Sequence, residues 1–245
     1  MAVMKKHLLF LIGLCWAFIA FSQEEKKLVF DANAQARSVG AFSGIEISGA
    51  ISLYLSQGKE SAVAVSAGDA DLLEKIKTEV RNNVLYIYLE TKGMSWKKWG
   101  NTGIKAYVTF EDLSSLEASG ACNIKTAGTV KLDELKIQLS GASDFTGEVD
   151  LGNLRIDLSG ASQANLKGKA EKTQMIASGA SSIKSFDLVS NYCKIDASGA
   201  SSIRIHVAKE ISAEASGASS IQYKGEAIIK DFSSSGASSV KRKND

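Results

Sequence analysis

Apolar and polar residues alternate with a period of two on both sides of a small-residue corner that recurs along most of the chain. The corner is the tetrapeptide Ser-Gly-Ala-Ser, seen in full from residues 140–143 onward, with the variants Ser-Gly-Ala-Ile at 48–51 and Ser-Gly-Ala-Cys at 119–122. An alternation of this kind places successive side chains on opposite faces of an extended backbone. Each repeat is therefore predicted to contain two short strands joined by a bend.

The glycine of each corner marks a regular period. From Gly120 to Gly236, successive corner glycines are 18 to 21 residues apart, which indicates a structural repeat. Glycine allows the unusual dihedral angles or close backbone approach that such a bend needs, while alanine and serine keep it thin enough to stack. The predicted structural corners are Gly49, Gly120, Gly141, Gly160, Gly179, Gly199, Gly217 and Gly236.

Three positions of the repeat are mostly apolar: four and two residues before the corner glycine, and four residues after it. We expect these positions to point inward. A repeat of this size cannot bury a core alone, so neighbouring repeats must stack. The sequence therefore predicts an all-β fold, a single-stranded right-handed parallel β-helix or β-solenoid, with rungs about 4.8 Å apart. The handedness follows precedent among such folds.

Residues 39–113 are expected to form a β-rich N-terminal part, with strands at 45–47, 51–55, 62–65, 84–89 and 104–110. One face of a helix would contain Leu72, Leu73, Ile76 and Val80, and Asp71 with Glu74 resembles a capping box. One short helix is therefore expected over about 71–80. Solenoid repeats should occupy 114–240, and 39–240 should be one continuous domain. The helix-bearing part and a charged tail at 241–245 are expected to cover the two exposed strand edges.

Residues 1–22 have the features of a signal peptide. Lys5 and Lys6 precede an apolar run at 8–21, which ends in a small-x-small cleavage site. Leu14 before Cys15 argues against lipidation, so simple export to the periplasm or the cell exterior is expected, with no transmembrane span in the mature chain. Residues 23–38 are charged and weakly patterned, which predicts a flexible lead.

The net charge limits the kinds of molecule that this protein can bind, and the cysteine positions indicate whether a disulfide forms. Removal of Lys5 and Lys6 lowers the formal charge from +2 to zero, and no basic stripe remains beyond 241–243, which argues against nucleic acid as a partner. Cys122 and Cys193 lie at different phases of the repeat. We therefore expect two small buried side chains rather than a disulfide.

A column of acidic and amide residues is the strongest candidate for catalysis. It lies between the two apolar columns that precede the corner, and Asp157, Asp196 and Glu214 could serve a polysaccharide lyase or hydrolase on a β-helix. The column is interrupted by Gln138 and Ile176, however, and basic or polar residues follow the corner at Lys125, Lys184, Arg204, Gln222 and Lys241. A solvated face of mixed charge explains this pattern better. His206, the single histidine of the mature chain, supports neither a triad nor a zinc site, and no catalytic residue, cofactor or metal is predicted.

The loop at 92–100 is the candidate for ligand or partner contact. It concentrates Trp96 and Trp99 around Lys97 and Lys98. Exposed tryptophans would suit stacking on sugar rings or docking a protein. The alternative is that both rings fold back over the side of the solenoid.

The segments 42–50 and 53–58, the helix, and the serial corners closely resemble the family described as putative auto-transporter adhesin, head GIN domain, over roughly residues 39–240. This resemblance implies an exported β-helical protein of the cell envelope, of a kind frequent in Bacteroidetes, with adhesion as the proposed role. It supplies no catalytic residues. We therefore expect a non-enzymatic, adhesin-like binding module whose partner is a surface glycan or protein, with a carbohydrate-active enzyme as the alternative.

Overall fold

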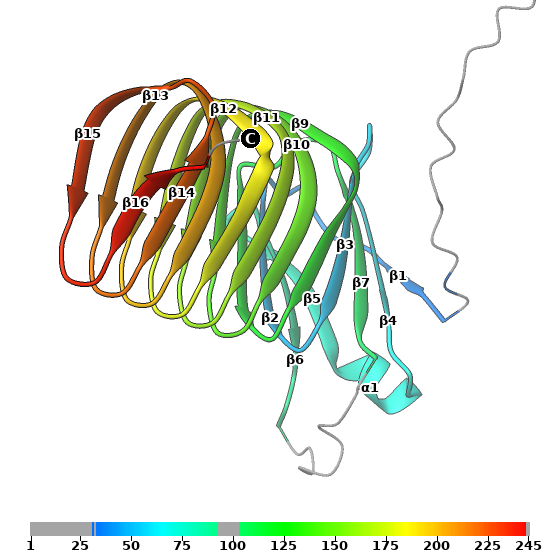
Figure 1. Ribbon diagram of the computed structural model, residues 1–245. Coiled ribbons are helices and arrows are strands. Elements are labelled where there is room, and N and C mark those ends of the chain that lie inside the picture. The colour runs from blue at the N-terminus through cyan, green and yellow to red at the C-terminus, as the bar shows by residue number, and fades with distance from the viewer. Residues whose placement is uncertain (1–30, 32, 93–102, 244–245) are drawn as a thin grey trace, which may run out of the picture.

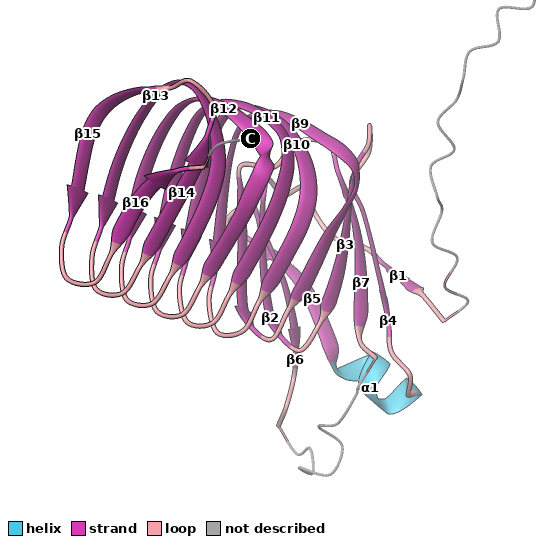
Figure 2. Ribbon diagram, viewed as in Figure 1, coloured by secondary structure: helices cyan, strands magenta, loops and turns pink. Residues whose placement is uncertain are grey.

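A computed structural model describes residue 31, residues 33–92 and residues 103–243, and it forms a β-solenoid of about seven turns (Figures 1 and 2). The predicted fold class, a β-solenoid with one short helix, is confirmed. The elements are β1 (Gln35–Arg37), β2 (Gly44–Gly49), β3 (Ser52–Gln57), β4 (Ala62–Ser66), α1 (Ala70–Lys75), β5 (Ile76–Arg81), β6 (Val84–Leu89), β7 (Lys105–Phe110), β8 (Ser115–Gly120), β9 (Asn123–Leu139), β10 (Asp144–Leu158), β11 (Gln163–Ala177), β12 (Ser182–Ala197), β13 (Ser202–Ala215), β14 (Ser220–Lys224), β15 (Ile228–Ser234) and β16 (Ser239–Arg242).

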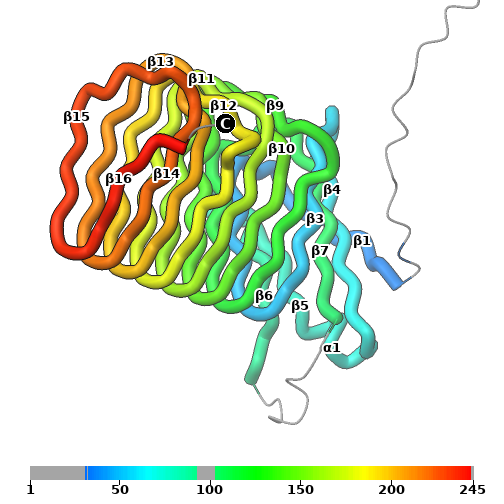
Figure 3. Tube along the Cα trace, viewed as in Figure 1, coloured from blue at the N-terminus to red at the C-terminus, as the bar shows by residue number. Residues whose placement is uncertain are grey.

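Long parallel strands wrap around the solenoid, and each one pairs with the rung before and the rung after it (Figure 3). The predicted inward columns are in register. In β10, for example, Ile156 pairs with Ile137 on one side and Met175 on the other, and all three side chains are buried. The core is therefore a set of apolar ladders that run along the axis.

The N-terminal part is continuous with the repeats. In the first rung, β2 pairs in parallel with β8, so that Gly49 lies against Gly120, and β3 pairs with β9. Antiparallel strands then extend this end of the sheet, with β4 on β7 and β5 on β6. Part of the expected flexible lead is ordered, because β1 pairs antiparallel with β4.

The helix is shorter than expected. It spans Ala70–Lys75, and the chain continues directly as β5, which contains Ile76 and Val80. These two residues pair with β6 across a two-residue turn in which Asn82 and Asn83 both have positive φ, the geometry of a tight hairpin. The N-cap is Asp69, whose carboxylate accepts a hydrogen bond from the Asp71 amide at 2.9 Å. The cap therefore lies two residues before the Asp71 of the expected capping box, and the helix ends early because Ile76–Arg81 pairs with β6.

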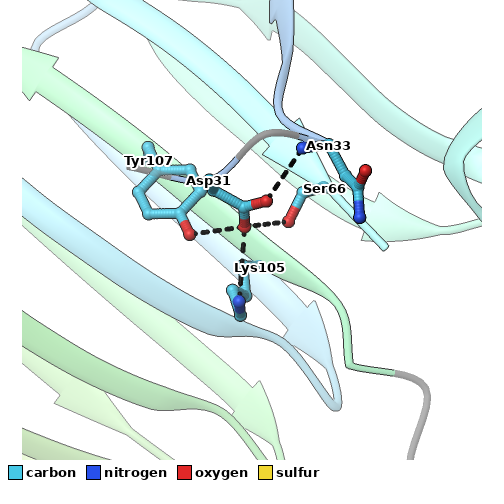
Figure 4. Close-up of polar contacts among 5 residues, drawn as sticks. All are labelled: Asp31, Asn33, Ser66, Lys105 and Tyr107. Carbon is cyan, nitrogen blue, oxygen red and sulfur yellow. Dashed lines mark hydrogen bonds and ion pairs between the residues drawn. The ribbon is translucent and has the colours of Figure 1, made fainter. Parts of the chain in front are cut away.

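A buried carboxylate attaches the start of the described chain to the sheet (Figure 4). Asp31, whose side chain is 11% exposed, accepts hydrogen bonds from Ser66 Oγ at 2.7 Å, Tyr107 OH at 2.8 Å and Lys105 Nζ at 3.3 Å. The Asn33 amide donates to its other oxygen at 3.1 Å. The hydrogen bonds, that from Ser66 foremost, hold the pKa of Asp31 well below its usual range. Asp31 therefore fixes the segment that leads into β1.

The corners stack at van der Waals contact. Gly160, Gly179, Gly199 and Gly217 have φ of 69° to 70°, and the alanine after each corner glycine donates its amide to the glycine carbonyl of the preceding rung, as in Ala180 N to Gly160 O at 2.8 Å. A Cβ added to Gly179 would lie 2.7 Å from the carbonyl oxygen of Gly160. Both the backbone angle and the close approach require glycine, as predicted.

The last serine of the corner is buried in the five rungs from Ser143 to Ser219 and half-buried at Ser238, but its hydroxyl is not always satisfied. Ser219 Oγ donates to Ala197 O at 3.0 Å, whereas Ser181 Oγ has no hydrogen-bond partner among the described residues. We expect Ser219→Ala to lower the free energy of unfolding by about 1 kcal/mol, and Ser181→Ala to leave it unchanged or raise it. Equilibrium denaturation in urea measures both changes. Equal losses in the two variants would contradict this assignment.

The C-terminal end of the solenoid is less covered than the N-terminal end. The last strands, β15 and β16, each pair on one side only within the described chain, and Ile228 and Ile229 are exposed. Lys230 is the extra residue at a register shift in β15, and a bulge with a charge weakens an edge as a template for pairing. The expected charged tail is partly strand, because β16 runs to Arg242.

Candidate functional site

Two outward ladders flank the stacked corners. We call the outward position three residues before each corner glycine the acidic ladder, which comprises Glu46, Glu117, Gln138, Asp157, Ile176, Asp196, Glu214 and Ser233. We call the position five residues after each corner glycine the basic ladder, which comprises Tyr54, Lys125, Thr146, Asn165, Lys184, Arg204, Gln222 and Lys241. Parallel in-register pairing places each ladder in a line along the solenoid axis.

The acidic ladder brings three carboxylates into one cleft, those of Glu46, Glu117 and Asp157. A shallow cleft of about 280 Å³ covers its first half and ends at Ile176 and Ser178. Asp157 lines this cleft, but both of its oxygens accept hydrogen bonds from Arg155, at 3.0 and 3.2 Å. Asp196 and Glu214 lie on the rungs beyond the cleft. A glycosidase needs an acid and a second carboxylate on either side of a bound sugar, and the predicted candidates Asp157, Asp196 and Glu214 do not share one cleft.

A wider groove of about 590 Å³ follows the basic ladder, and we call it the lateral groove. One wall is the ladder from Lys125 to Arg204, the opposite wall includes Glu148, Lys167, Phe186 and Asp187, and the floor includes Gly147, Leu166 and Ser185. Gly147 is buried, and a Cβ there would lie 2.9 Å from side-chain atoms of Thr126 and Phe145, so the packing leaves no room for a larger residue at this position. The groove crosses five rungs.

The wall opposite the basic ladder contains an ion pair and an aromatic ring. Lys167 Nζ lies 2.7 Å from Glu148 Oε2, and this contact lowers the pKa of Glu148 and raises that of Lys167. Phe186 is half-buried, and Lys224 Nζ and Lys243 Nζ lie 5.4 and 5.1 Å from its ring centroid. Such distances are those of cation–π contacts.

The cations of the ladder itself are not neutralised. Lys125, Lys184 and Arg204 are exposed, and none of them forms an ion pair with a residue that the structure describes. At the N-terminal end of the same line, Tyr54 stacks on Tyr107 with ring centroids 5.2 Å apart. The groove therefore presents a line of free positive charge beside polar side chains.

Cys122 and Cys193 are buried free thiols, as expected. Burial raises the pKa of Cys193 to about 12 and raises that of Cys122 as well. Because the thiolate is the reactive form, we expect a thiol reagent at about pH 8 to label native mature protein at least roughly 100-fold more slowly than protein unfolded in guanidinium. Rapid labelling of either thiol in the native state would contradict the buried positions.

The remaining candidate residues add no catalytic or metal site within the described part of the chain. His206 is half-buried on β13, and among the described residues no group of three or more His, Cys, Asp or Glu side chains is placed to hold a metal ion. Trp96, Lys97, Lys98 and Trp99, the predicted contact residues, lie outside the residues that the structure describes. In the described part of the chain, no helix has the length and apolar character needed to traverse a bilayer.

The lateral groove was not predicted from the sequence, although its ladder was. Its shape depends on two register shifts. In the first, β9 has extra residues opposite Gly147, and in the second, Phe186 of β12 is an extra residue with no partner in β11. Insertions of this kind break the period on which the alignment of repeats depends. The available signal was Phe186 itself, a large aromatic residue between the polar positions Ser185 and Asp187.

Similar proteins show the same fold. A crystal structure of a putative adhesin from Bacteroides fragilis matches with a TM-score of 0.79 and 20% identity, over 85% of this chain and 95% of that chain. A putative lipid binding protein from Parabacteroides distasonis matches with a TM-score of 0.65 and 19% identity, over 87% and 98%. A putative adhesin from Parabacteroides merdae matches with a TM-score of 0.62 and 20% identity, over 86% and 95%. No curated protein matches.

A family model matches most of the residues that form the solenoid. The model described as putative auto-transporter adhesin, head GIN domain, matches residues 41–227, which include the first corner at Gly49 and five of the six full Ser-Gly-Ala-Ser corners. The match agrees with the resemblance noted in the sequence and with the fold of the solved structures. The chain belongs to the putative auto-transporter adhesin, head GIN domain, family.

Proposed function

We propose that this protein is an exported, non-enzymatic binding module of the cell envelope, and that it contacts a surface glycan or protein through the side of its solenoid. The observation that carries the proposal is the lateral groove, an open surface lined by free cations and polar side chains. The acidic ladder, by contrast, does not bring Asp157, Asp196 and Glu214 into one cleft, and both oxygens of Asp157 accept hydrogen bonds from Arg155.

The names of the related proteins support a binding role. The family and two of the solved neighbours are described as putative adhesins, and a third neighbour as a putative lipid binding protein. A rigid solenoid suits this role because its side chains are held in fixed columns before a ligand arrives, which lowers the entropic cost of binding. Export through the predicted signal peptide at 1–22 would place the module where surface ligands occur.

The test measures both binding and cleavage of each ligand that is offered. The exported chain from residue 23 onward is immobilised and presented with a panel of glycans, matrix proteins and whole cells, and the soluble products are analysed. We expect retention of at least one ligand class without product release. A Trp96→Ala/Trp99→Ala variant reports the contribution of the predicted contact loop, and Asp196→Asn reports that of the acidic ladder. Product release that Asp196→Asn abolishes would instead support a polysaccharide-degrading enzyme.

A further inference from the structure

We propose that the lateral groove binds a linear anionic polysaccharide, whose chain runs along the solenoid axis and whose carboxylate or sulfate groups meet Lys125, Lys184 and Arg204. This inference rests on the proposed binding function and names its ligand class and site. It does not involve the predicted contact loop at 92–100.

The geometry favours an extended polymer over a small anion. Lys184 and Arg204 are cross-rung neighbours, and Lys125 lies three rungs from Lys184 through Asn165 and Thr146. With rungs about 4.8 Å apart, the backbone positions of the three cations span about 19 Å in one line. A small anion would meet only one end of this line, whereas an extended chain can meet both ends.

The charge pattern favours an acidic ligand. On the opposite wall, Lys167 is paired with Glu148 at 2.7 Å, and Asp187 adds a second carboxylate. Lys224 Nζ and Lys243 Nζ lie over the ring of Phe186 on the same wall, so lysines match the carboxylates there. The three ladder cations have no such partner among the described residues, and each can form a charge-assisted hydrogen bond with an incoming carboxylate or sulfate. Because they are exposed, their desolvation on binding costs little compared with that of buried cations.

The lining favours a glycan over a folded protein. Protein interfaces usually have an apolar, desolvated centre, but the exposed large hydrophobic residues, Val189, Ile228 and Ile229, all lie outside the groove. The groove instead offers Thr146 and Asn165 for the hydroxyl groups of a sugar. A polymer with a regular repeat also matches a site that repeats from rung to rung.

The experiment measures equilibrium binding of the exported chain to polymers of matched length. The panel contains polygalacturonate and chondroitin sulfate as anionic glycans, dextran as a neutral glycan, and polyglutamate and single-stranded DNA as other polyanions. We expect binding to one or both anionic glycans and at least about tenfold weaker binding to dextran. The affinity should also fall when the ionic strength rises from about 0.05 M to about 0.5 M, because the contacts are exposed.

Two matched double variants locate the site. Lys184→Ala/Arg204→Ala should weaken binding of the anionic glycan by about tenfold or more. Lys172→Ala/Lys194→Ala removes the same charge from two exposed lysines on neighbouring rungs outside the groove and should leave binding nearly unchanged. Both variants alter exposed side chains, and circular dichroism checks that the fold is intact. Equal losses in the two variants would overturn the assignment of the groove.

The remaining outcomes separate this inference from the proposed function. Binding to neutral glycans or to proteins alone would overturn the inference and leave the binding module standing. Equal or tighter binding of polyglutamate or DNA through the same two residues would replace the glycan by an acidic chain of another class. Failure to bind any member of this panel or of the wider one would overturn both.

Discussion

Replacement of Gly179 by alanine is expected to lower the free energy of unfolding by about 3 to 5 kcal/mol, enough to unfold much of a marginally stable population. Two effects add at this residue. Its φ of +69° is unfavourable for a residue with a Cβ, and that Cβ would lie 2.7 Å from the Gly160 carbonyl oxygen, which accepts a hydrogen bond from Ala180. Equilibrium denaturation in guanidinium measures the loss.

Gly49 provides a matched control for this substitution. It occupies the same corner of the first rung with φ of +108°, but no atom lies within 4 Å of a Cβ built on it. Gly49→Ala should therefore show only the backbone strain, about 1 to 2 kcal/mol. A loss in Gly179→Ala no larger than that in Gly49→Ala would show that stacking of the corners does not limit stability.

Replacement of Asp31 by asparagine is expected to cost about 2 to 3 kcal/mol near pH 7, because the carboxylate accepts charge-assisted hydrogen bonds from Ser66, Tyr107 and Lys105. Desolvation and the bond to Asp31 raise the pKa of Tyr107, so its hydroxyl remains a donor in this cluster. Urea denaturation of the wild type and the variant measures the difference. Asp144→Asn is the control, since the Asp144 side chain has no hydrogen bond or ion pair with a described residue.

The cost of Asp31→Asn should also depend on pH. The folded-state pKa of Asp31 is depressed, so its contribution is complete above the pKa of about 3.9 in the unfolded chain and is lost as the pH falls through the folded value. Between these two pKa values the unfolded state binds more protons. The difference between wild type and variant should therefore shrink by about 1 kcal/mol from pH 7 to about pH 3. An equal difference at both pH values would contradict the role of the ionised carboxylate.

The repeated part of the fold could be predicted from the sequence because each rung repeats the same local constraint. Gly141, Gly160 and Gly179 need the same backbone angle, and the apolar columns around them need the same inward face, so one alignment predicts many contacts. The first rung at Gly49 follows the same rule although its corner is a variant.

Features that depend on distant or non-periodic partners were not predictable in this way. The spacing of Ile76 and Val80 fits a helix, and only pairing with β6 makes this segment a strand. The side-chain partners of Asp31 lie 35 to 76 residues away in sequence, so no local pattern reveals that its carboxylate is largely buried. The lateral groove likewise arises from bulges around Gly147 and Phe186, which interrupt the period.

The most direct test of the central claim, that this solenoid binds its ligand without altering it, is the length of the bound polymer. The chain from residue 23 onward is incubated with each glycan that it retains, at protein concentrations that saturate the polymer, and the polymer is analysed by size-exclusion chromatography with light scattering. We expect stable complexes, and we expect the polymer recovered after prolonged incubation to have its original length. Progressive shortening of the polymer, dependent on Asp157, Asp196 or Glu214, would contradict it and identify an enzyme.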